Sequence, residues 1–184
     1  MNSKRCCITI LVRIFVVLLF TSSSVLSPVQ AADASYQIKA SYIFNFLKFI
    51  EFPQEDLSKG STVLVCLLGK DYFEDALDEI DGAKTANVTI KVLRLDRFDE
   101  PLPLPKQCNV ALISKSEVEL AQNVLASINV HNVLTIADFS PFISYGGMIE
   151  FFEIEDTVRF KINKDLVKET RYRIAAQLVE IGVK

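Results

Sequence analysis

Hydrophobic positions between Tyr36 and Ile50 recur at the spacing of an α-helix. They fall on two adjacent stripes, formed by Ala40, Ile43, Leu47 and Ile50 and by Tyr42, Phe46 and Phe49. Together the stripes cover about half of the helix circumference. The pattern predicts a helix buried on two sides, or buried on one side with an interface on the other. Phe52-Pro53 ends it, because proline disfavours the α conformation in the preceding residue.

Four apolar runs further along the chain predict short strands, at Thr62–Leu68, Asn87–Leu95, Asn109–Ser114 and Val133–Ile136. The second run alternates and predicts one wet face, whereas the first and third are nearly continuous and suit burial on both faces. Helices are expected at Asp71–Ile80 and from Ser116 to Ile128, where Ser116 is the N-cap and Glu119 completes a capping box. This order of elements is typical of a mostly parallel sheet.

The C-terminal third predicts a hairpin and a final helix. Met148–Ile154 and Thr157–Ile162 are separated only by Glu155-Asp156, which favours an antiparallel pair at one edge of the sheet. Lys164 to Ile181 is expected to form one helix. The predicted fold class is therefore α/β, with a mostly parallel sheet flanked by helices on both faces and an antiparallel edge hairpin.

Residues 1–31 have the pattern of a cleaved secretory signal peptide. Lys4 and Arg5 supply charge, Ile8–Phe20 is apolar, and Val29-Gln30-Ala31 resembles a small-residue cleavage site. The alternative is a membrane anchor, but Arg13 interrupts the apolar run, which is shorter than the ~20 residues of a span. The expected mature protein is a single domain, residues 32–184, exported to the periplasm and not inserted in the membrane.

Removing the signal leaves 17 basic and 23 acidic residues, a net charge of about −6. Nucleic acids and anionic membranes are recognised through basic patches, so this balance argues against both as partners.

Two cysteines remain after removal of Cys6 and Cys7 with the signal: Cys66 and Cys108. In an oxidising compartment such a pair most simply forms one disulfide, closing a loop of roughly 40 residues for a gain of ~3 to 4 kcal/mol. The alternative is zinc, but two thiolates and the single histidine, His131, would need carboxylates to complete a site. No metal site is predicted.

Catalytic and cofactor motifs are missing from the sequence. Serine or cysteine catalysis would have to use His131, and no glycine-rich phosphate loop follows a predicted strand. We therefore expect no catalytic residues, no cofactor and a protein that is not an enzyme.

Two basic residues interrupt the apolar faces of their predicted helices. Lys39 falls between the directions of Ile50 and Phe46, and Arg171 falls inside the apolar arc of the last helix. Each could be a snorkelling side chain or half of a structural ion pair. The alternative is that Lys39 and Arg171 face an anionic group of a ligand or partner.

Several motifs, taken in order, resemble those of the YfiR family of periplasmic regulators. They are KASYIFNFLKFIEFP at 39–53, CLLG at 66–69, Cys108 before a strand ending in Ile113-Ser114, VLTI at 133–136, GGMI at 146–149 and FKIN at 160–163. Phe52 stands where the family usually has tryptophan, and residues 171–178 match the family only loosely.

The resemblance implies a periplasmic protein that binds the sensor domain of a membrane-bound diguanylate cyclase and represses it, thereby controlling cyclic di-GMP and biofilm formation. It also implies a homodimer. The surface expected to meet the partner is the Gly146–Phe152 segment with the last helix, and the candidates are Met148, Ile149, Phe151, Phe152 and Arg173. The alternative function is a periplasmic receptor for a small anionic metabolite, with Lys39 and Arg171 as its binding residues.

Overall fold

A computed structural model describes residues 30–53, 61–86, 88–95, 107–128 and 132–182. Most of the predicted signal peptide (1–29), the proline-containing segment 101–105 and His131 lie outside the described residues. Residues 32–184 form one compact unit. Within the described ranges, no helix is both long and apolar enough to cross a membrane.

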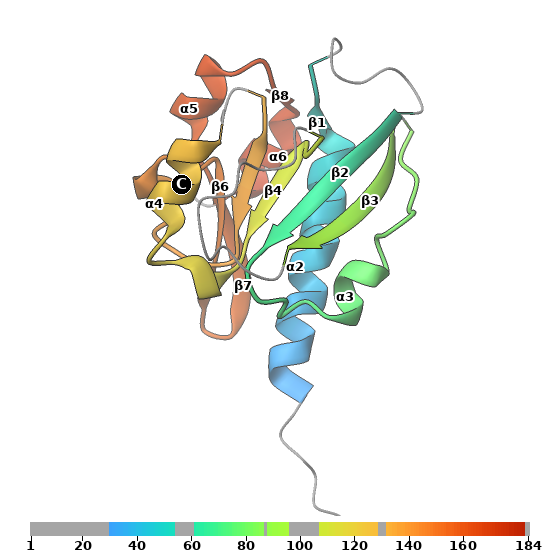
Figure 1. Cartoon of the computed structure of the whole chain (residues 1–184), viewed down its shortest axis with the longest axis vertical. Helices are drawn as coiled ribbons and strands as arrows, with labels where there is room; N and C mark the ends of the chain where they lie inside the picture. The colour runs from blue at the N-terminus through green and yellow to red at the C-terminus, as the bar shows by residue number, and fades with distance from the viewer. Residues whose placement is uncertain (1–29, 54–60, 87, 96–106, 129–131, 183–184) are drawn as a thin grey trace, which may run out of the picture. The chain divides into compact units, whose positions relative to one another are not determined.

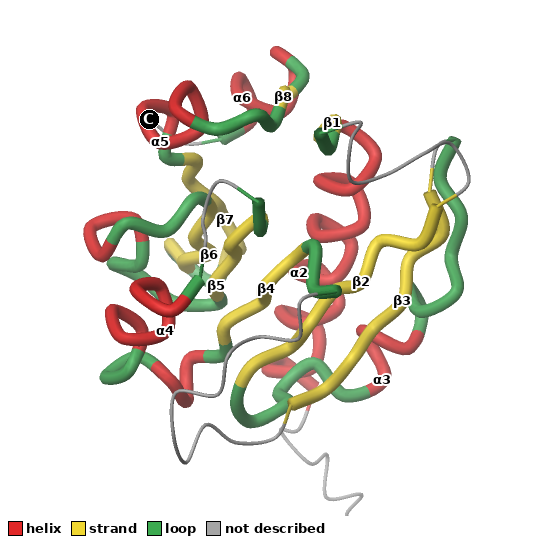
Figure 2. The backbone as a smooth tube through the Cα atoms, turned by 45° about the horizontal axis from the view of Figure 1, so that its top comes forward, coloured by secondary structure: helices red, strands yellow, loops and turns green. Residues whose placement is uncertain are grey.

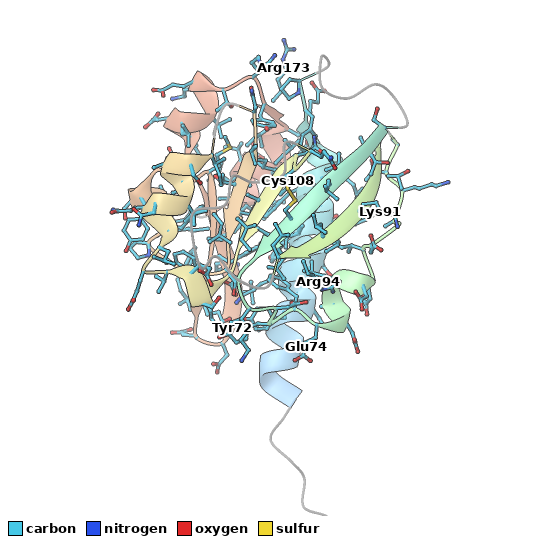
Figure 3. All side chains as sticks on the ribbon, in the orientation of Figure 1. Tyr72, Glu74, Lys91, Arg94, Cys108 and Arg173 are labelled. Carbon is cyan, nitrogen blue, oxygen red and sulfur yellow. A yellow bond between two sulfur atoms is a disulfide. The ribbon has the colours of Figure 1, made fainter. Side chains whose placement is uncertain are left out.

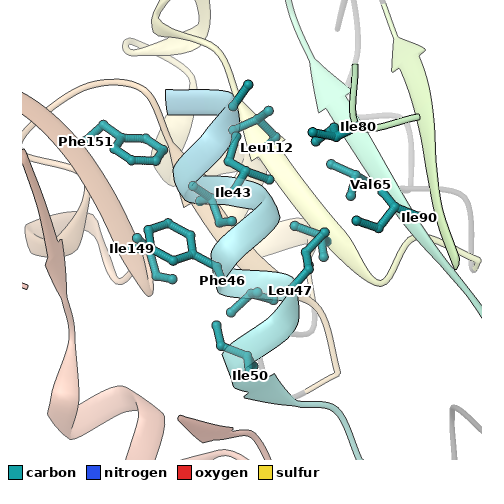
Figure 4. Packing of buried hydrophobic residues seen from close by; sticks show 14 of the residues in the cluster. Ile43, Phe46, Leu47, Ile50, Val65, Ile80, Ile90, Leu112, Ile149 and Phe151 are labelled. Carbon is teal, nitrogen blue, oxygen red and sulfur yellow. The ribbon is translucent and has the colours of Figure 1, made fainter. Parts of the chain in front are cut away.

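The first long element is α2 (Gln30–Phe49), which contains the helix predicted from the hydrophobic stripes. Ile43, Phe46 and Leu47 are almost completely buried, whereas Phe49 remains 42% exposed. Figure 4 shows this face of α2 between Ile149 and Phe151 on one side and Val65 and Leu112 on the other. Most of the hydrophobic surface formed by the two stripes of α2 is therefore buried within the chain itself.

A six-stranded sheet carries the fold, in the order β3-β2-β4-β5-β6-β7 (Figure 1). The strands are β2 (Ser61–Leu68), β3 (Val88–Leu95), β4 (Val110–Ile113), β5 (Leu134–Ala137), β6 (Ile149–Ile154) and β7 (Thr157–Ile162). Every neighbouring pair is parallel except β6 with β7, which is antiparallel. Glu155 and Asp156 join β6 to β7 with φ values of 48° and 58°, as a tight hairpin turn requires. The structure confirms the predicted fold class.

Helices cover both faces of this sheet because successive strand residues point to opposite sides. Val63, Val65 and Leu67 of β2 face the core that contains α2. Cys66 and Leu68 face a second, smaller core that contains α4 (Ala121–Ser127). β4 and β5 are buried at every position, which explains their continuous apolar runs.

The helix predicted at Asp71–Ile80 is wrong in its extent: the structure has only α3 (Asp75–Asp78). The Oδ1 atom of Asp71 accepts hydrogen bonds from the N–H groups of Phe73 (2.7 Å) and Glu74 (3.0 Å). Such local bonds compete with helix formation. Glu74 then adopts a φ of 47°, outside the helical region, so the helix cannot begin before Asp75.

The predicted capping box at Ser116 is also wrong. The capping residue is Ser114, whose side chain accepts from the N–H of Ser116, and it starts a single 3₁₀ turn, η1 (Lys115–Glu117). The α-helix begins only at Ala121. The predicted N-cap is two residues too late, because Ser114 and Ser116 have the same capping chemistry and the sequence does not distinguish them.

The final helix predicted at Lys164–Ile181 is broken into three elements: α5 (Lys164–Glu169), β8 (Arg173–Ile174) and α6 (Ala176–Ile181). β8 pairs antiparallel with β1 (Ile50–Glu51), directly after α2, and the two strands lie side by side in Figure 2. The N–H of Ala175 also donates to the carbonyl of Phe49. Pairing with a distant segment has thus overridden a helical hydrophobic pattern.

Candidate functional site

Cys66 and Cys108 form a disulfide, as the pattern of cysteines predicted, with their Cα atoms 5.9 Å apart (Figure 3). Both are buried, with 0% and 4% of their surface exposed. Cys66 lies in β2, and Cys108 lies two residues before β4, the neighbour of β2 in the sheet. The bond therefore joins two strands that are already paired, on the α4 side of the sheet.

Three of the five partner-binding candidates lie in the core. Met148, directly before β6, and Ile149 and Phe151 within it are completely buried in the core cluster that also contains α2. A side chain in that position cannot meet a partner, so their assignment is corrected to structural. Phe152 points to the other side of β6 and is half-buried beneath the Lys161 ammonium, 4.8 Å from its ring centroid, whereas Arg173 is exposed in β8.

Lys39 faces an anionic group, but that group belongs to the chain itself. Only 5% of Lys39 is exposed, and its Nζ lies 3.2 Å from Oε1 of Glu153 at the end of β6. The same ammonium lies 4.5 Å from the ring centroid of Tyr36. Lys39 is thus half of a structural ion pair, as one of its two interpretations proposed.

Arg171 is not in a helix, because the last predicted helix is broken at this point. Its side chain is exposed and donates from Nη2 to Oδ1 of Asn132 (3.0 Å). The predicted position inside an apolar arc is therefore wrong. Lys39 and Arg171 do not form one binding site: Lys39 pairs with Glu153, and Arg171 bonds to Asn132.

A group of polar and aromatic side chains gathers where the parallel strands end. This carboxyl-end cluster consists of Tyr36, Lys70, Tyr72, Lys115 and Asp138. Lys70, Lys115 and Asp138 follow β2, β4 and β5 closely, while Tyr36 comes from α2. The rings of Tyr36 and Tyr72 are nearly parallel, with centroids 6.1 Å apart. Figure 3 shows Tyr72 at one end of the sheet and Arg173 at the other.

Hydrogen bonds and charges hold the inner side of the cluster together. The Tyr36 hydroxyl donates to Oδ2 of Asp138 (3.1 Å). Burial raises the pKa of Asp138, although the charge of Lys39 opposes the shift. Burial and the neighbouring carboxylate of Asp138 likewise raise the pKa of Tyr36. Perturbed titratable groups of this kind gather at functional sites more often than elsewhere, although ion-pair networks produce them too.

Glu153 completes the electrostatics on the α2 side. It accepts a hydrogen bond from the Ser35 hydroxyl (2.6 Å) and pairs with Lys39. The bond from Ser35 lowers the pKa of Glu153, and Lys39 adds to the effect. Glu153 therefore links the end of β6 to α2 through its contacts with Ser35 and Lys39.

Sequence reasoning missed Tyr36, Lys70, Tyr72, Lys115 and Asp138 as a group. Three of them follow buried parallel strands, and the carboxyl ends of such strands meet at the edge where α/β proteins bind ligands. That signal was present in the sequence. The contribution of Tyr36 could not be seen there, because it depends on how α2 lies across the sheet.

Metal-binding side chains do not converge in the described part of the chain, where no three His, Cys, Asp or Glu residues are placed to hold an ion. Other ion pairs in this part of the chain join Arg94 to Asp71 and Asp78, and Lys161 to the buried carboxylate of Glu150.

Comparison with known proteins gives one family. The YfiR/HmsC-like family model matches residues 36–183, from Tyr36 of the carboxyl-end cluster to beyond α6. No curated protein matches the sequence. At the level of the family, this match supports a periplasmic regulator of a diguanylate cyclase. With a match that spans most of its length, including the disulfide-bonded sheet and both flanking layers, the chain belongs to the YfiR/HmsC-like family.

Proposed function

We propose that this protein is a periplasmic regulatory binding protein that represses a membrane-bound diguanylate cyclase by binding the periplasmic sensor domain of that enzyme. Repression would lower cyclic di-GMP in the cell and limit biofilm formation. The observation that carries the proposal is the family match over residues 36–183. The match covers the complete described fold from Tyr36 onward, so the regulatory role is proposed for the domain as a whole.

The accessible partner candidates are Phe152 and Arg173. Phe152 is half-buried and adds aromatic surface to β6, and Arg173 is exposed beside β1. Aromatic and arginine side chains carry much of the binding energy of protein interfaces. We propose that these two residues contribute contacts to the cyclase, whereas Met148, Ile149 and Phe151 support β6 from within the core.

The test is capture of the cyclase from detergent-solubilised membranes of the source organism by the immobilised mature protein. The expected result is enrichment of a membrane protein that carries a cyclase domain, identified by mass spectrometry. F152A/R173A should reduce capture about tenfold, which corresponds to about 1.4 kcal/mol. K84A, which removes an exposed charge next to the opposite edge strand, is the control and should capture normally. If the wild-type protein enriches no cyclase-domain protein, the proposal is wrong.

We also propose that the protein forms a homodimer, as members of its family are expected to do. Sedimentation equilibrium of the mature protein should give twice the monomer mass at micromolar concentration. A monomer mass across that range would contradict the dimer and leave the proposed repression untouched.

The alternative function, a receptor for a small anionic metabolite, loses the two residues on which it first rested. Lys39 is paired with Glu153, and Arg171 bonds to Asn132. The carboxyl-end cluster supports a ligand site of different composition.

A further inference from the structure

The carboxyl-end cluster lies at the point where the order of the strands reverses. The chain passes from β2 to its outer neighbour β3, but β4, on the other side of β2, continues in the opposite direction to β5. The segments that leave β2 and β4 therefore diverge at their carboxyl ends. In open α/β sheets, ligands bind in the crevice at this reversal. Lys70 and Lys115 lie on these two segments, two residues after each strand ends.

Both lysines point at one aromatic ring. The Nζ atoms of Lys70 and Lys115 lie 4.9 Å and 4.5 Å from the centroid of Tyr72, and that of Lys115 is also 5.4 Å from the centroid of Tyr36. Among the described residues, neither ammonium has a carboxylate within 4.0 Å. By contrast, Lys39, Lys91, Lys161 and Lys168 each have one.

Two like charges held on the same ring repel each other, and an anion between them would turn that repulsion into attraction. The cation–π contacts already restrict the rotamers of the two lysine side chains. Binding an anion therefore costs less side-chain conformational entropy. The pair is therefore better prepared for an anion than two independent surface lysines.

A hydrogen bond joins the two backbone segments that carry Lys70 and Lys115. The N–H of Lys70 donates to Oγ of Ser116 (2.9 Å), which ties the β2 segment to the β4 segment. Gly69 has a φ of +93°, and a Cβ at this position would lie 2.5 Å from Oγ of Ser116 and 2.6 Å from Oε1 of Glu117. Only glycine permits this approach, so the spacing of Lys70 and Lys115 is built into the backbone.

Asp138 supplies a hydrogen-bond acceptor on the inner side of the cluster, next to Tyr36 and Lys115. It is 5% exposed, Oδ2 accepts from Tyr36, and the backbone N–H of Lys115 also stabilises the carboxylate, but Oδ1 has no hydrogen-bond partner within the described residues. An unused acceptor in a buried carboxyl group is costly unless something donates to it. The charges that act on Asp138 from the surrounding elements are Lys39 of α2 and Lys115 of η1. A ligand oxygen that keeps a proton could donate to Oδ1.

We propose that the carboxyl-end cluster binds a protonated phosphate group, with its anionic oxygens between the ammonium groups of Lys70 and Lys115 and its hydroxyl donating to Oδ1 of Asp138. Free phosphate and the singly protonated form of a phosphate monoester share this chemistry. Sulfate has similar size and charge but no proton to donate at neutral pH, so the acceptor at Asp138 should select against it. The site lies at the opposite end of the sheet from Arg173, and phosphate binding can be measured without the cyclase.

The test is calorimetric titration of the complete mature protein with inorganic phosphate, with glycerol phosphate and with sulfate, at constant ionic strength and at pH 6, where about half of a monoester keeps its proton. We expect phosphate or glycerol phosphate to bind at millimolar or lower concentration, and sulfate to bind about tenfold more weakly. Tighter binding of glycerol phosphate identifies a monoester as the ligand, and tighter binding of phosphate identifies the free ion.

K70Q/K115Q should weaken binding at least about tenfold. K84Q/K164Q, which removes the same charge from two exposed lysines outside the cluster, should bind as the wild type does. D138N should abolish the preference for phosphate over sulfate. Equal binding by the two double variants, no binding by the wild type, or equal affinity for sulfate would each overturn the proposal. Because cyclase capture is measured separately, such a failure leaves the proposed repression unaffected.

Discussion

Removal of the Cys66–Cys108 disulfide should destabilise the protein without changing its fold. The sequence separation of 42 residues gives a loss of about 4 kcal/mol from the entropy that the unfolded chain regains. The folded state should survive, because two hydrogen bonds between Leu64 and Asn109 hold the same strands together beside the bond. The N–H of Leu64 donates to Oδ1 of Asn109 (2.8 Å), and the N–H of Asn109 donates to the carbonyl of Leu64 (3.0 Å).

The assay is urea unfolding of the oxidised wild type and of C66A/C108A, followed by far-ultraviolet circular dichroism. A loss of about 4 kcal/mol is a large part of the 5 to 15 kcal/mol typical of a domain, so the midpoint should fall strongly while the native spectrum stays the same. Wild-type protein reduced in urea is the control and should unfold like the variant. A difference below about 1 kcal/mol would show that the disulfide does not stabilise the domain by restricting the unfolded chain.

Three further changes test individual features. The raised folded-state pKa of Asp138 means that its contribution to stability is complete below the unfolded value of 3.8 and is lost as pH rises through the folded value. Urea unfolding at several pH values should therefore show D138N gaining stability relative to wild type as pH increases; a constant difference would contradict this. G147A should lower the melting temperature by several degrees, because the new Cβ would overlap the ring of Phe142. An unchanged melting temperature would show that the ring can move. N163A should cost about 1 kcal/mol in urea unfolding, since Asn163 caps α5 by accepting from the N–H of Leu166. No loss would remove the capping role.

The sequence was sufficient for features that depend on local periodicity. The long apolar arc predicted α2, the continuous runs predicted β2, β4 and β5, and the two-residue spacing at Glu155-Asp156 predicted the hairpin. The cysteine pair was predictable because compartment and number left one simple arrangement.

The sequence was insufficient where distant segments decide the structure. The apolar pattern of the C-terminal segment indicated one helix, but Ile174 pairs with Ile50, which is distant from it along the sequence. The sequence could not show which face of β6 is buried, for a related reason. Alternation places Phe151 and Phe152 on opposite faces, but only the position of α2 shows which of them is buried.

Repression of a diguanylate cyclase can be measured directly on the activity of that enzyme. Membranes that contain the cyclase identified by capture are incubated with GTP. The rate of cyclic di-GMP formation is followed while the mature protein is added to the periplasmic side. We expect the rate to fall with protein concentration to a low plateau, and F152A/R173A to require a higher concentration for the same effect. A rate that stays constant at saturating protein would contradict the proposed repression.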